Sequence, residues 1–310
     1  MYNVFIDGKE GTTGLQIYDR LGKRSDINII SLGEDKRKDV SARKECLNSA
    51  DISFLCLPDA AAKEAASLVD NPKAKIIDAS TAHRTDCGWV YGLPEISEER
   101  KAQIANSSRV ANPGCHATGF ITLVAPLVKC GILSPDYPFV AHSVTGYSGG
   151  GKKMIAQYED KDRGIEFSSP RQYALTLSHK HLPEMVNECG LSYAPVFNPI
   201  VADYYCGMCV TVPVHTRLMN KKMGVKDVRE FFAEYYARHN FIKIVNDDEI
   251  PGFLAANALA GTNNLNIYVS GNEERVLLAS VFDNLGKGAS GAAVQNMNIM
   301  LGLDETFSLV

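Results

Sequence analysis

The sequence predicts an α/β fold: a doubly wound parallel sheet accompanied by a second domain of the α+β class. Three observations carry this prediction. The chain has 310 residues, a length typical of two domains. Strand and helix patterns alternate through residues 2–111, as in parallel sheets. Beyond that stretch, strands rich in Val, Tyr and Thr mix with fewer helices.

The composition excludes several classes of protein. Apolar residues make up 45% of the chain and charged residues 22%, as in a globular protein with a large core. The net charge is -4 with no long basic run, so we do not expect a nucleic-acid partner. No apolar run reaches the ~18 residues of a membrane span. The start of the chain lacks signal-peptide features and eight cysteines are too sparse for a disulfide scaffold, so we expect a cytoplasmic protein.

The first strand leads directly into a glycine-rich turn. Residues 2–7 form an apolar strand pattern, Gly8, Gly11 and Gly14 follow at spacings of three, and a helical pattern begins at Leu15. Strand, glycine turn and helix form the order that lets a pyrophosphate rest on a helix N-terminus. An ordinary βα loop is the alternative. We predict a Rossmann-type cofactor turn made by Gly8, Gly11, Thr12, Thr13 and Gly14.

The second strand, over residues 26–32, suggests which cofactor binds. NAD enzymes usually carry an acidic residue at the end of this strand. Here the strand ends in Ser31, and the basic cluster 36–38 follows. A hydroxyl with a basic cluster suits a 2′-phosphate, so we predict NADP contacts at Ser31 and Arg37. The competing interpretation is a solvated loop in which Glu34 and Asp35 offset the basic charges.

The alternation then continues to a cysteine. In chain order, we expect a strand over 51–57, a helix over 60–69 and a strand over 75–78. A turn over 91–95, a helix over 96–107 and a strand over 109–111 follow. Ser80 and Arg84 follow strand 75–78, at the edge where open α/β sheets bind ligands.

Asn112-Pro113-Gly114-Cys115 precedes an apolar run over 120–133 that is typical of a buried helix. Cys115 is therefore expected at a helix start, where backbone N–H groups and the helix dipole favour a thiolate nucleophile. A buried, inert thiol in a turn is the alternative. The side chain of His116 is expected to point elsewhere and to be structural.

The second domain begins after the cysteine helix, which we place at 117–133. We expect a mobile, donor-rich loop over 146–153 and an irregular segment over 154–178. A glycine-rich start over 283–291 opens a terminal helix that ends near Leu301. The other expected elements are strands 139–143, 194–201, 206–216, 242–245, 265–270 and 276–283 and a helix over 228–239.

Two patterns in the sequence contain residue types that bind metals. His179 and His181 point the same way in an extended segment, and Cys206 and Cys209 form a Cys-x-x-Cys. The histidines have no convincing further ligands, and no second pair at zinc spacing accompanies the cysteines, which lie in a strand pattern. We therefore predict no metal.

Taken together, these motifs closely resemble the N-acetyl-γ-glutamyl-phosphate reductases, particularly the shorter bacterial type. The resemblance covers residues 8 to about 300 in the family's order. It differs in one loop, where Ser148-Gly149-Gly150-Gly151 replaces Ser-Gly-Ala-Gly. The matching pieces are the glycine turn, Asp78-Ala79-Ser80 with Arg84, Tyr91-Gly92-Leu93-Pro94-Glu95, Asn112-Pro113-Gly114-Cys115, His179-Lys180-His181 with Pro183-Glu184, and Asn284-Leu285-Gly286-Lys287-Gly288.

The resemblance implies an NADPH-dependent reduction of an acyl phosphate to an aldehyde in arginine biosynthesis. Cys115 would form a thioester with release of phosphate, and an imidazole would manage the protons. The family places that base in the 179–181 segment; both histidines remain candidates, and we favour His179. The implied substrate contacts are Arg84, Asn112, Ser148, Gly149, Lys152 and Glu184, and the implied further cofactor contacts are Ser80, Asn284, Gly286, Lys287 and Gly288.

We expect a dinucleotide-binding domain over 1–115, to which a helix over 286–310 returns, and a catalytic and dimerisation domain over 116–285. A homo-oligomer, dimer or tetramer, is expected. Two other functions stay open: a related reductase of another amino-acid acyl phosphate, such as an aspartate-semialdehyde dehydrogenase, and an NADP-binding redox sensor that uses Cys115 alone.

Overall fold

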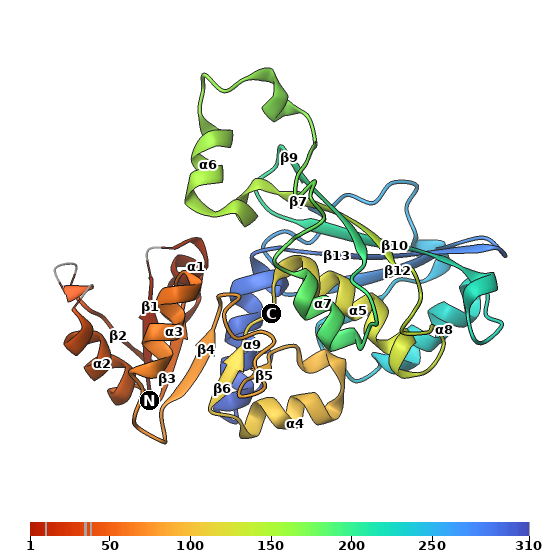
Figure 1. Ribbon diagram of the computed structural model, residues 1–310. Coiled ribbons are helices and arrows are strands. Elements are labelled where there is room, and N and C mark those ends of the chain that lie inside the picture. The colour runs from red at the N-terminus through yellow and green to blue at the C-terminus, as the bar shows by residue number, and fades with distance from the viewer. Residues whose placement is uncertain (10, 34–35, 38, 310) are drawn as a thin grey trace. The chain divides into compact units, whose positions relative to one another are not determined.

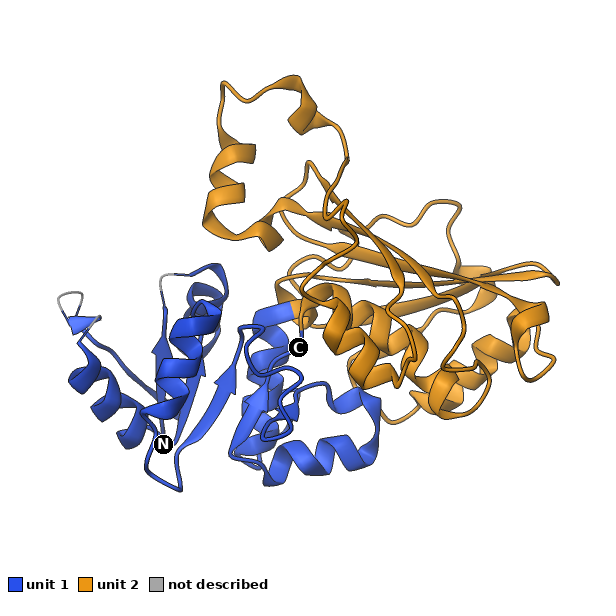
Figure 2. Cartoon of the chain, viewed as in Figure 1, with its two compact units in different colours: residues 1–113, 289–310 blue, residues 114–288 orange. Residues whose placement is uncertain are grey.

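The computed structural model describes residues 1–9, 11–33, 36–37 and 39–309. The chain forms two compact units (Figure 2): residues 1–113 with 289–310, and residues 114–288. The expected boundaries lay close by, after residue 115 and before residue 286. The structure thus makes Cys115 part of the second unit, together with residues 286–288.

The described residues of the first unit form a six-stranded sheet with the order β2-β1-β3-β4-β6-β5 (Figure 1). All neighbouring strands are parallel. The chain leaves β1 for β2 on one side and returns to β3 on the other, which puts the topological switch point between β1 and β3. Ligands of open α/β sheets bind at the carboxyl ends of such strands. The strands are β1 Tyr2–Asp7, β2 Ile27–Ile30, β3 Ile52–Leu55, β4 Lys75–Asp78, β5 Val90–Tyr91 and β6 Arg109–Ala111.

Helices connect these strands. One of them, α2 (Val40–Ser49), was missed in the sequence, because it has no apolar stripe: its two buried residues are Arg43 and Leu47. Its start was readable, since Asp39 accepts a hydrogen bond from the Ala42 N–H as a helix cap. The remaining helices are α1 Thr12–Leu21, α3 Asp59–Ser67, α4 Glu98–Asn106 and α9 Gly291–Met300, with a 3₁₀ turn at Pro94–Ile96.

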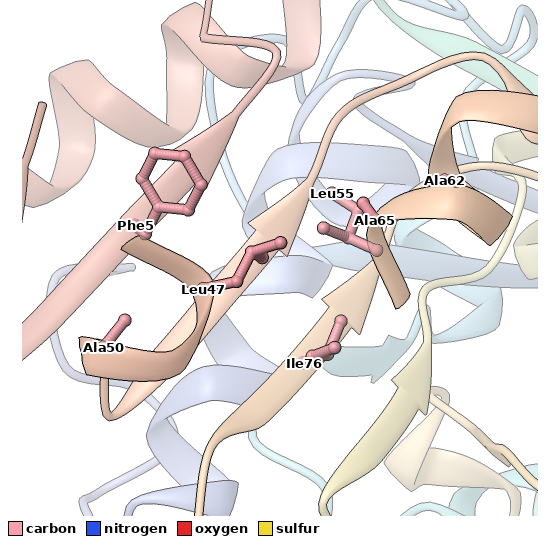
Figure 3. Close-up of a cluster of buried hydrophobic side chains, with 7 residues drawn as sticks. All are labelled: Phe5, Leu47, Ala50, Leu55, Ala62, Ala65 and Ile76. Carbon is pink, nitrogen blue, oxygen red and sulfur yellow. The ribbon is translucent and has the colours of Figure 1, made fainter. Parts of the chain in front are cut away.

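One buried hydrophobic cluster of the first unit lies between the sheet and helices α2 and α3 (Figure 3). Burying each large aliphatic or aromatic side chain stabilises the fold by about 1.5–3 kcal/mol. Helix α9 packs against β4, α1 and α4, and each of its residues is buried. The cluster drawn in Figure 3 consists of Phe5, Leu47, Ala50, Leu55, Ala62, Ala65 and Ile76.

The described residues of the second unit form a seven-stranded mixed sheet with the order β11-β12-β13-β10-β7-β9-β8. Pairs β7–β9 and β11–β12 are parallel and the others antiparallel. The α/β first unit and mixed second unit confirm the predicted fold class. The strands are β7 Val140–Gly146, β8 Arg171–Gln172, β9 Val196–Ala202, β10 Met208–His215, β11 Ile242–Ile244, β12 Leu265–Gly271 and β13 Arg275–Phe282.

Helices α5 (Cys115–Lys129), α7 (Leu182–Cys189) and α8 (Val225–Tyr235) cover one face of this sheet (Figure 1). Helix α5 approaches so closely at Gly119 that a Cβ there would lie 2.5 Å from Val210 Cγ2. It begins at Cys115 and ends four residues before the predicted end at 133.

One expectation for this unit was wrong. The segment expected to be a mobile loop and then irregular chain contains a 3₁₀ turn, Tyr147–Gly150, and helix α6, Gly151–Glu159. After its glycine start, α6 consists mainly of good helix formers, and the preceding glycine run obscured them. In the part of the chain that the structure describes, no helix is long and apolar enough to cross a membrane.

Candidate active site

Cys115 is the first residue of α5 and is half-buried. Its N-cap is Gly114, so no side chain caps the helix, and the first turn carries no acidic residue. The N–H groups of a first turn have no acceptors within their own helix, and the dipole places partial positive charge there. A thiolate and an oxyanion are both stabilised in this position.

The segment before α9 closes tightly on this cysteine. Gly288 belongs to a π-helical turn, Gly286–Ser290, and a Cβ on it would lie 2.8 Å from Cys115 Cβ. Only a residue without a side chain permits this approach. Gly288 therefore adjoins the predicted nucleophile within the second unit.

Both predicted histidines lie in this unit, with ring centroids 4.7 Å apart. The backbone N–H of His181 donates to His179 Nδ1 at 3.1 Å, so neutral His179 carries its proton on Nε2. His181 is buried, and its Nε2 lies 4.0 Å from Glu184 Oε1. The other oxygen of Glu184 accepts the Gly114 N–H at 3.0 Å. Glu184 thus joins the second histidine to the residue before Cys115.

His116 also belongs to this histidine cluster. Its ring centroid lies 5.3 Å from that of His179 and 5.5 Å from that of His181. Its nitrogens hydrogen-bond Ser143 Oγ and Tyr173 Oη, each at 2.7 Å. Burial, and then the charges of His179 and Lys180, lower the pKa of His116 to about 3. Sequence reasoning missed Tyr173, which lies in the segment expected to be irregular.

Asn284 ties two loops of the second unit together. Its Oδ1 accepts the Gly207 N–H at 2.8 Å, and its Nδ2 donates to Ser148 Oγ at 3.1 Å. Ser148 is buried, whereas Gly149 beside it and Lys152, in the first turn of α6, are exposed. Of these predicted contacts, Gly149 and Lys152 are open to solvent.

The neighbouring residues of the 284–288 motif shape the inside of this unit. Lys287 is fully buried, and its Nζ lies 5.6 Å from the Phe241 ring centroid. A Cβ on Gly286 would lie 2.1 Å from the Thr262 carbonyl oxygen. Both residues are thus closely packed within the second unit, and their predicted contact with the cofactor stays a prediction.

The glycine turn after β1 has the geometry of a phosphate-binding turn. Gly8 has φ +86°, and a Cβ on it would lie 2.3 Å from the Cys56 carbonyl oxygen. A Cβ on Gly14 would lie 2.6 Å from the Gly8 carbonyl oxygen. Within the described residues, Gly11 caps α1 without a side-chain hydrogen bond, and the buried Thr12 Oγ1 has no partner. Backbone donors and an unsatisfied hydroxyl at one helix start fit a pyrophosphate; Thr13 lies in the same first turn.

Ser31 and Arg37, the predicted 2′-phosphate contacts, follow β2 and are exposed. The third basic residue of the cluster and the two acidic residues beside it, positions 38, 34 and 35, lie outside the described residues. Asp7 ends β1 next to this turn and pairs with buried Arg43 of α2 at 2.9 Å. Burial raises the pKa of Asp7, against the opposing effect of Arg43.

Three predicted ligand contacts in the first unit are engaged by the protein itself. Ser80 Oγ donates to Asp78 at 2.7 Å, and Arg84 Nε donates to the Asn112 carbonyl at 2.9 Å. The Asn112 side chain donates to the Ala289 carbonyl at 3.0 Å and is 1% exposed. Arg84 and Asn112 therefore fix the turn that leads to the cysteine.

Of the Cys-x-x-Cys pair, Cys209 lies in β10 and Cys206 lies two residues before it, and all eight cysteines of the chain are free. Burial raises the pKa of Cys206 to about 11, with Asp283 adding to it, and burial alone raises that of Cys209 to about 11. Across the described ranges, no group of three or more His, Cys, Asp or Glu side chains is arranged to hold a metal ion.

Comparison with known proteins assigns both units. The NAD-binding domain of semialdehyde dehydrogenases matches residues 3–104, and the semialdehyde dehydrogenase dimerisation domain matches residues 115–284. The chain belongs to the semialdehyde dehydrogenase family. It is therefore an oxidoreductase whose first unit binds a nicotinamide cofactor.

Sequence relatives show which enzymes of this family the chain resembles. The chain is 46% identical to N-acetyl-gamma-glutamyl-phosphate reductase 2 of Pseudomonas putida, with 96% of each chain covered. It is 45% identical to the Nostoc sp. protein of the same name, covering 99% of this chain and 98% of that one. These relatives confirm the resemblance predicted from the motifs. Aspartate semialdehyde dehydrogenase II of Vibrio cholerae shares the fold at 15% identity, with a TM-score of 0.72 over 97% of this chain and 98% of that one.

Proposed function

We propose that the protein reduces N-acetyl-γ-glutamyl phosphate to N-acetylglutamate semialdehyde with NADPH, releasing phosphate, as a step of arginine biosynthesis. The observation that carries this proposal is Cys115 at an uncapped helix start in the unit that holds the His179–His181 pair. Support comes from relatives that bear this enzyme's name at 44–46% identity over nearly the whole chain.

The first chemical step uses the thiolate. Cys115 sulfur attacks the acyl carbonyl, the C–O bond to phosphate breaks, and a thioester forms. The N–H groups of the first turn of α5 stabilise the oxyanion. A nicotinamide cofactor held by the first unit would supply the hydride that reduces this thioester. The resulting thiohemiacetal loses its hydroxyl proton, the C–S bond breaks and the semialdehyde leaves.

The hydrogen bonds divide the proton transfers between the two histidines. His179 Nδ1 already accepts a backbone N–H, so its Nε2–H is a donor suited to the substrate oxygen. His181 Nε2 faces the Glu184 carboxylate, which leaves Nδ1 as the atom that can accept the Cys115 proton. We therefore assign His181 as the base and His179 as the donor, although the sequence favoured His179 as the base.

The reverse reaction tests the proposed function. Protein incubated with N-acetylglutamate semialdehyde, phosphate and NADP should produce NADPH, measured by absorbance. Cys115→Ala should abolish this turnover and leave NADP binding unchanged. A folded protein that reduces no NADP would refute the proposal. A higher kcat/KM for aspartate semialdehyde would instead establish the related aspartyl reductase, and NADP binding with thiol oxidation but no turnover would establish a redox sensor.

NADP is the cofactor we propose, because Ser31 and Arg37 are exposed after β2 at the cofactor edge of the sheet. Arg37→Ala should weaken NADP binding about tenfold or more, the loss of one charge-assisted contact, and leave NAD binding unchanged. Lys23→Ala is the matched control, since Lys23 is exposed before β2, at the opposite edge. Equal effects of Arg37→Ala on both cofactors would exclude this contact.

Among the remaining predicted contacts, we propose that exposed Lys152 binds the phosphate or carboxylate of the substrate. Ser148 and Gly149, nearby in the chain, offer further hydrogen-bond donors. Lys152→Ala should raise KM with little change in kcat. Lys63→Ala, on α3, removes another exposed positive charge as control. A changed kcat with unchanged KM would contradict this assignment.

We propose that the protein is a dimer in the cytoplasm. The eight free cysteines suit a reducing compartment. The sheet face of the second unit that carries no helix exposes Leu277 and Val196, and a second copy would cover it. Leu277→Glu should shift the mass measured by light scattering to that of the monomer, 33.8 kDa. A tetrameric mass, or a Leu277→Glu variant that stays a dimer, would rule out this interface.

A further inference from the structure

Arg171, the first residue of β8, is a half-buried arginine whose guanidinium is held by two aromatic side chains. Its Cζ lies over both rings, 3.9 Å from the Phe167 centroid and 4.9 Å from the Tyr158 centroid. Its Nε donates to Tyr158 Oη at 3.2 Å. A guanidinium is attracted to the faces of aromatic rings, and the hydrogen bond adds a preferred orientation. The side chain of Arg171 is therefore positioned by the protein itself.

The rings that hold Arg171 are packed in turn against other aromatic side chains. They belong to segment 147–170, which leaves the sheet after β7 and returns at β8 (Figure 1). Tyr158 is 2% exposed, and its ring stacks on that of Tyr147 with centroids 4.7 Å apart and planes inclined by 10°. Phe167 meets Tyr158 edge to face at 5.1 Å. The guanidinium thus rests on a packed aromatic cluster.

The rest of this guanidinium is not engaged by the described part of the chain. Within the described residues, the Nε bond is the one hydrogen bond of the Arg171 side chain, and no carboxylate pairs with it. Arg163, in the same segment, instead binds Asp203 through both Nη atoms, at 2.9 and 2.6 Å. The two Nη groups of Arg171 form a planar fork that matches two oxygens of a carboxylate or a phosphate. Arg171 can therefore receive an anion that is not part of the described chain.

The pairing of β8 with β9 fixes the side of the sheet on which Arg171 lies. Arg171 is opposite the buried Val201 of β9. The half-buried Tyr173 continues this pairing, since its N–H donates to the Pro199 carbonyl at 3.1 Å, and exposed Gln172 lies between the two. Side chains two residues apart in an extended chain point to the same side. Arg171 and Tyr173 therefore lie on one side of the sheet, and Gln172 lies on the other.

The side shared by Arg171 and Tyr173 carries the histidine cluster. Tyr173 Oη and His116 Nε2 are hydrogen-bonded at 2.7 Å, and the Tyr173 and His179 ring centroids lie 5.9 Å apart. The Phe197 ring of β9 lies 5.2 Å from the rings of both histidines. Phe197 precedes the β9 partner of Arg171 by four residues, about 13 Å along the strand. Arg171 therefore leaves the sheet at the edge of the histidine cluster.

We propose that the two Nη groups of Arg171 bind an oxyanion of the substrate at the edge of the histidine cluster. This inference rests on the proposed function, whose substrate has two such groups, the acyl phosphate and the carboxylate. The phosphate is joined to the reacting carbonyl through one oxygen, whereas the carboxylate is at the far end of the glutamyl chain. Because Arg171 is further along the sheet from Phe197 than Tyr173 is, we expect it to hold the carboxylate.

The reverse reaction separates the two anions, because semialdehyde and phosphate are then different substrates. Arg171→Ala should raise the KM for N-acetylglutamate semialdehyde about tenfold or more, the loss of a charge-assisted contact, with little change in kcat. The KM for phosphate should stay unchanged, as should kcat/KM for an uncharged aldehyde such as butanal. A raised KM for phosphate, with that for the semialdehyde unchanged, would instead assign the phosphate to Arg171.

Protection of Cys115 from alkylation tests the same contact without turnover. Iodoacetamide would be applied to the full chain with increasing N-acetylglutamate or, separately, inorganic phosphate, and the peptide containing Cys115 followed by mass spectrometry. Half-protection by the anion that Arg171 binds should require about tenfold more of it in Arg171→Ala. Arg171→Lys should fall between this variant and wild type, since it keeps the charge but loses the fork.

Arg163→Ala is the matched control, because its guanidinium belongs to the same segment but is already paired with Asp203. It should be protected like wild type. Equal losses in Arg163→Ala and Arg171→Ala would attribute the effect to the fold of the segment and overturn the proposal. Unchanged protection and unchanged KM values in Arg171→Ala would also overturn it, as would absence of protection by either anion in wild type.

The outcome can be read even where one variant or one assay fails. If Arg171→Ala does not fold, Arg171→Lys decides, since it keeps a cation on both rings. Wild-type protein that reduces NADP while Arg171→Ala behaves like it would leave the proposed reaction standing and remove only the role of Arg171. Protection does not require turnover, so failure of the reductase assay leaves the protection result readable.

Discussion

Gly288 and Cys115 pack so closely that a Cβ added to Gly288 would lie 2.8 Å from Cys115 Cβ and 3.3 Å from Cys115 Cα. These residues are far apart in sequence, and the contact explains why a glycine is needed at the end of the 284–288 motif. It also sets how far the first turn of α5 can move.

Gly288→Ala should therefore displace Cys115 and lower kcat at least about tenfold, since misplaced reacting groups are costly. The unfolding free energy should fall by about 1–3 kcal/mol from overpacking. Kinetics and urea unfolding measure the two effects. Gly252→Ala is the control, because an added Cβ there has nothing within 4 Å. Wild-type kinetics in Gly288→Ala would show that the turn adapts without disturbing the nucleophile.

Glu184 should matter for stability and for catalysis in separable ways. Glu184→Ala leaves the buried Gly114 N–H without its acceptor and should lower the unfolding free energy by about 1–3 kcal/mol. Glu184→Gln keeps an acceptor for that N–H but removes the charge beside His181, so stability should recover more than kcat. Thermal unfolding and steady-state kinetics would be compared. Parallel losses in both variants would assign Glu184 to folding alone.

The assigned roles of the two histidines predict unequal losses. His181→Asn should reduce kcat by about 10²–10⁴, the contribution of a positioned general base. It should also slow alkylation of Cys115 near neutral pH, because the proton acceptor is gone. His179→Asn should reduce kcat while leaving alkylation close to wild type, since His179 serves the substrate oxygen. The reverse pattern would make His179 the base.

His116 should make stability depend on pH in acid. Its pKa is about 3 in the folded chain, below the 6.5 of an unperturbed histidine. As pH falls below 6.5, His116 is protonated in the unfolded chain but stays neutral in the folded chain until about pH 3. The free energy of unfolding therefore decreases as pH falls from 6.5 to about 3. The loss is on the order of a few kcal/mol. Urea unfolding of His116→Gln should show a shallower decline.

The matched control for this effect is His142→Gln, because His142 is exposed. It should retain the wild-type decline of stability with acidification. Identical pH dependence in His116→Gln and wild type would mean that the buried imidazole does not limit acid stability.

Much of the fold was predictable because its signals are local. Strands β1, β4 and β6 were placed with correct bounds, since short apolar runs between turn residues define them. Helices α2 and α6 were missed for opposite reasons. Helix α2 lacks an apolar stripe because one of its buried residues, Arg43, is charged. Arg43 can be buried because it pairs with Asp7, which only the tertiary structure brings close. A run of glycines obscured the start of α6.

Residues of the candidate site could be predicted where the chemistry requires a particular residue type, such as a thiol nucleophile or an imidazole base. Cys115 and the histidine pair could be named from their motifs. The sequence could not distinguish contacts to a ligand from contacts within the protein, because both use the same polar side chains. Arg84 and Asn112, for example, were predicted as ligand contacts and hydrogen-bond other parts of the protein in this structure. Tyr173 had no motif, and folding brings it to His116 across 57 residues.

Helix α9 has a consequence for the order in which the chain is completed on the ribosome. The first unit requires α9, whose buried residues pack against β4, α1 and α4. These residues are synthesised only after the whole of 114–288 has emerged. The second unit is one uninterrupted segment and can fold first, although domains usually fold from the N-terminus during synthesis. The cofactor-binding unit, which begins the chain, is thus the last to be finished, so a chain truncated before α9 would carry its nucleophile without a completed dinucleotide fold.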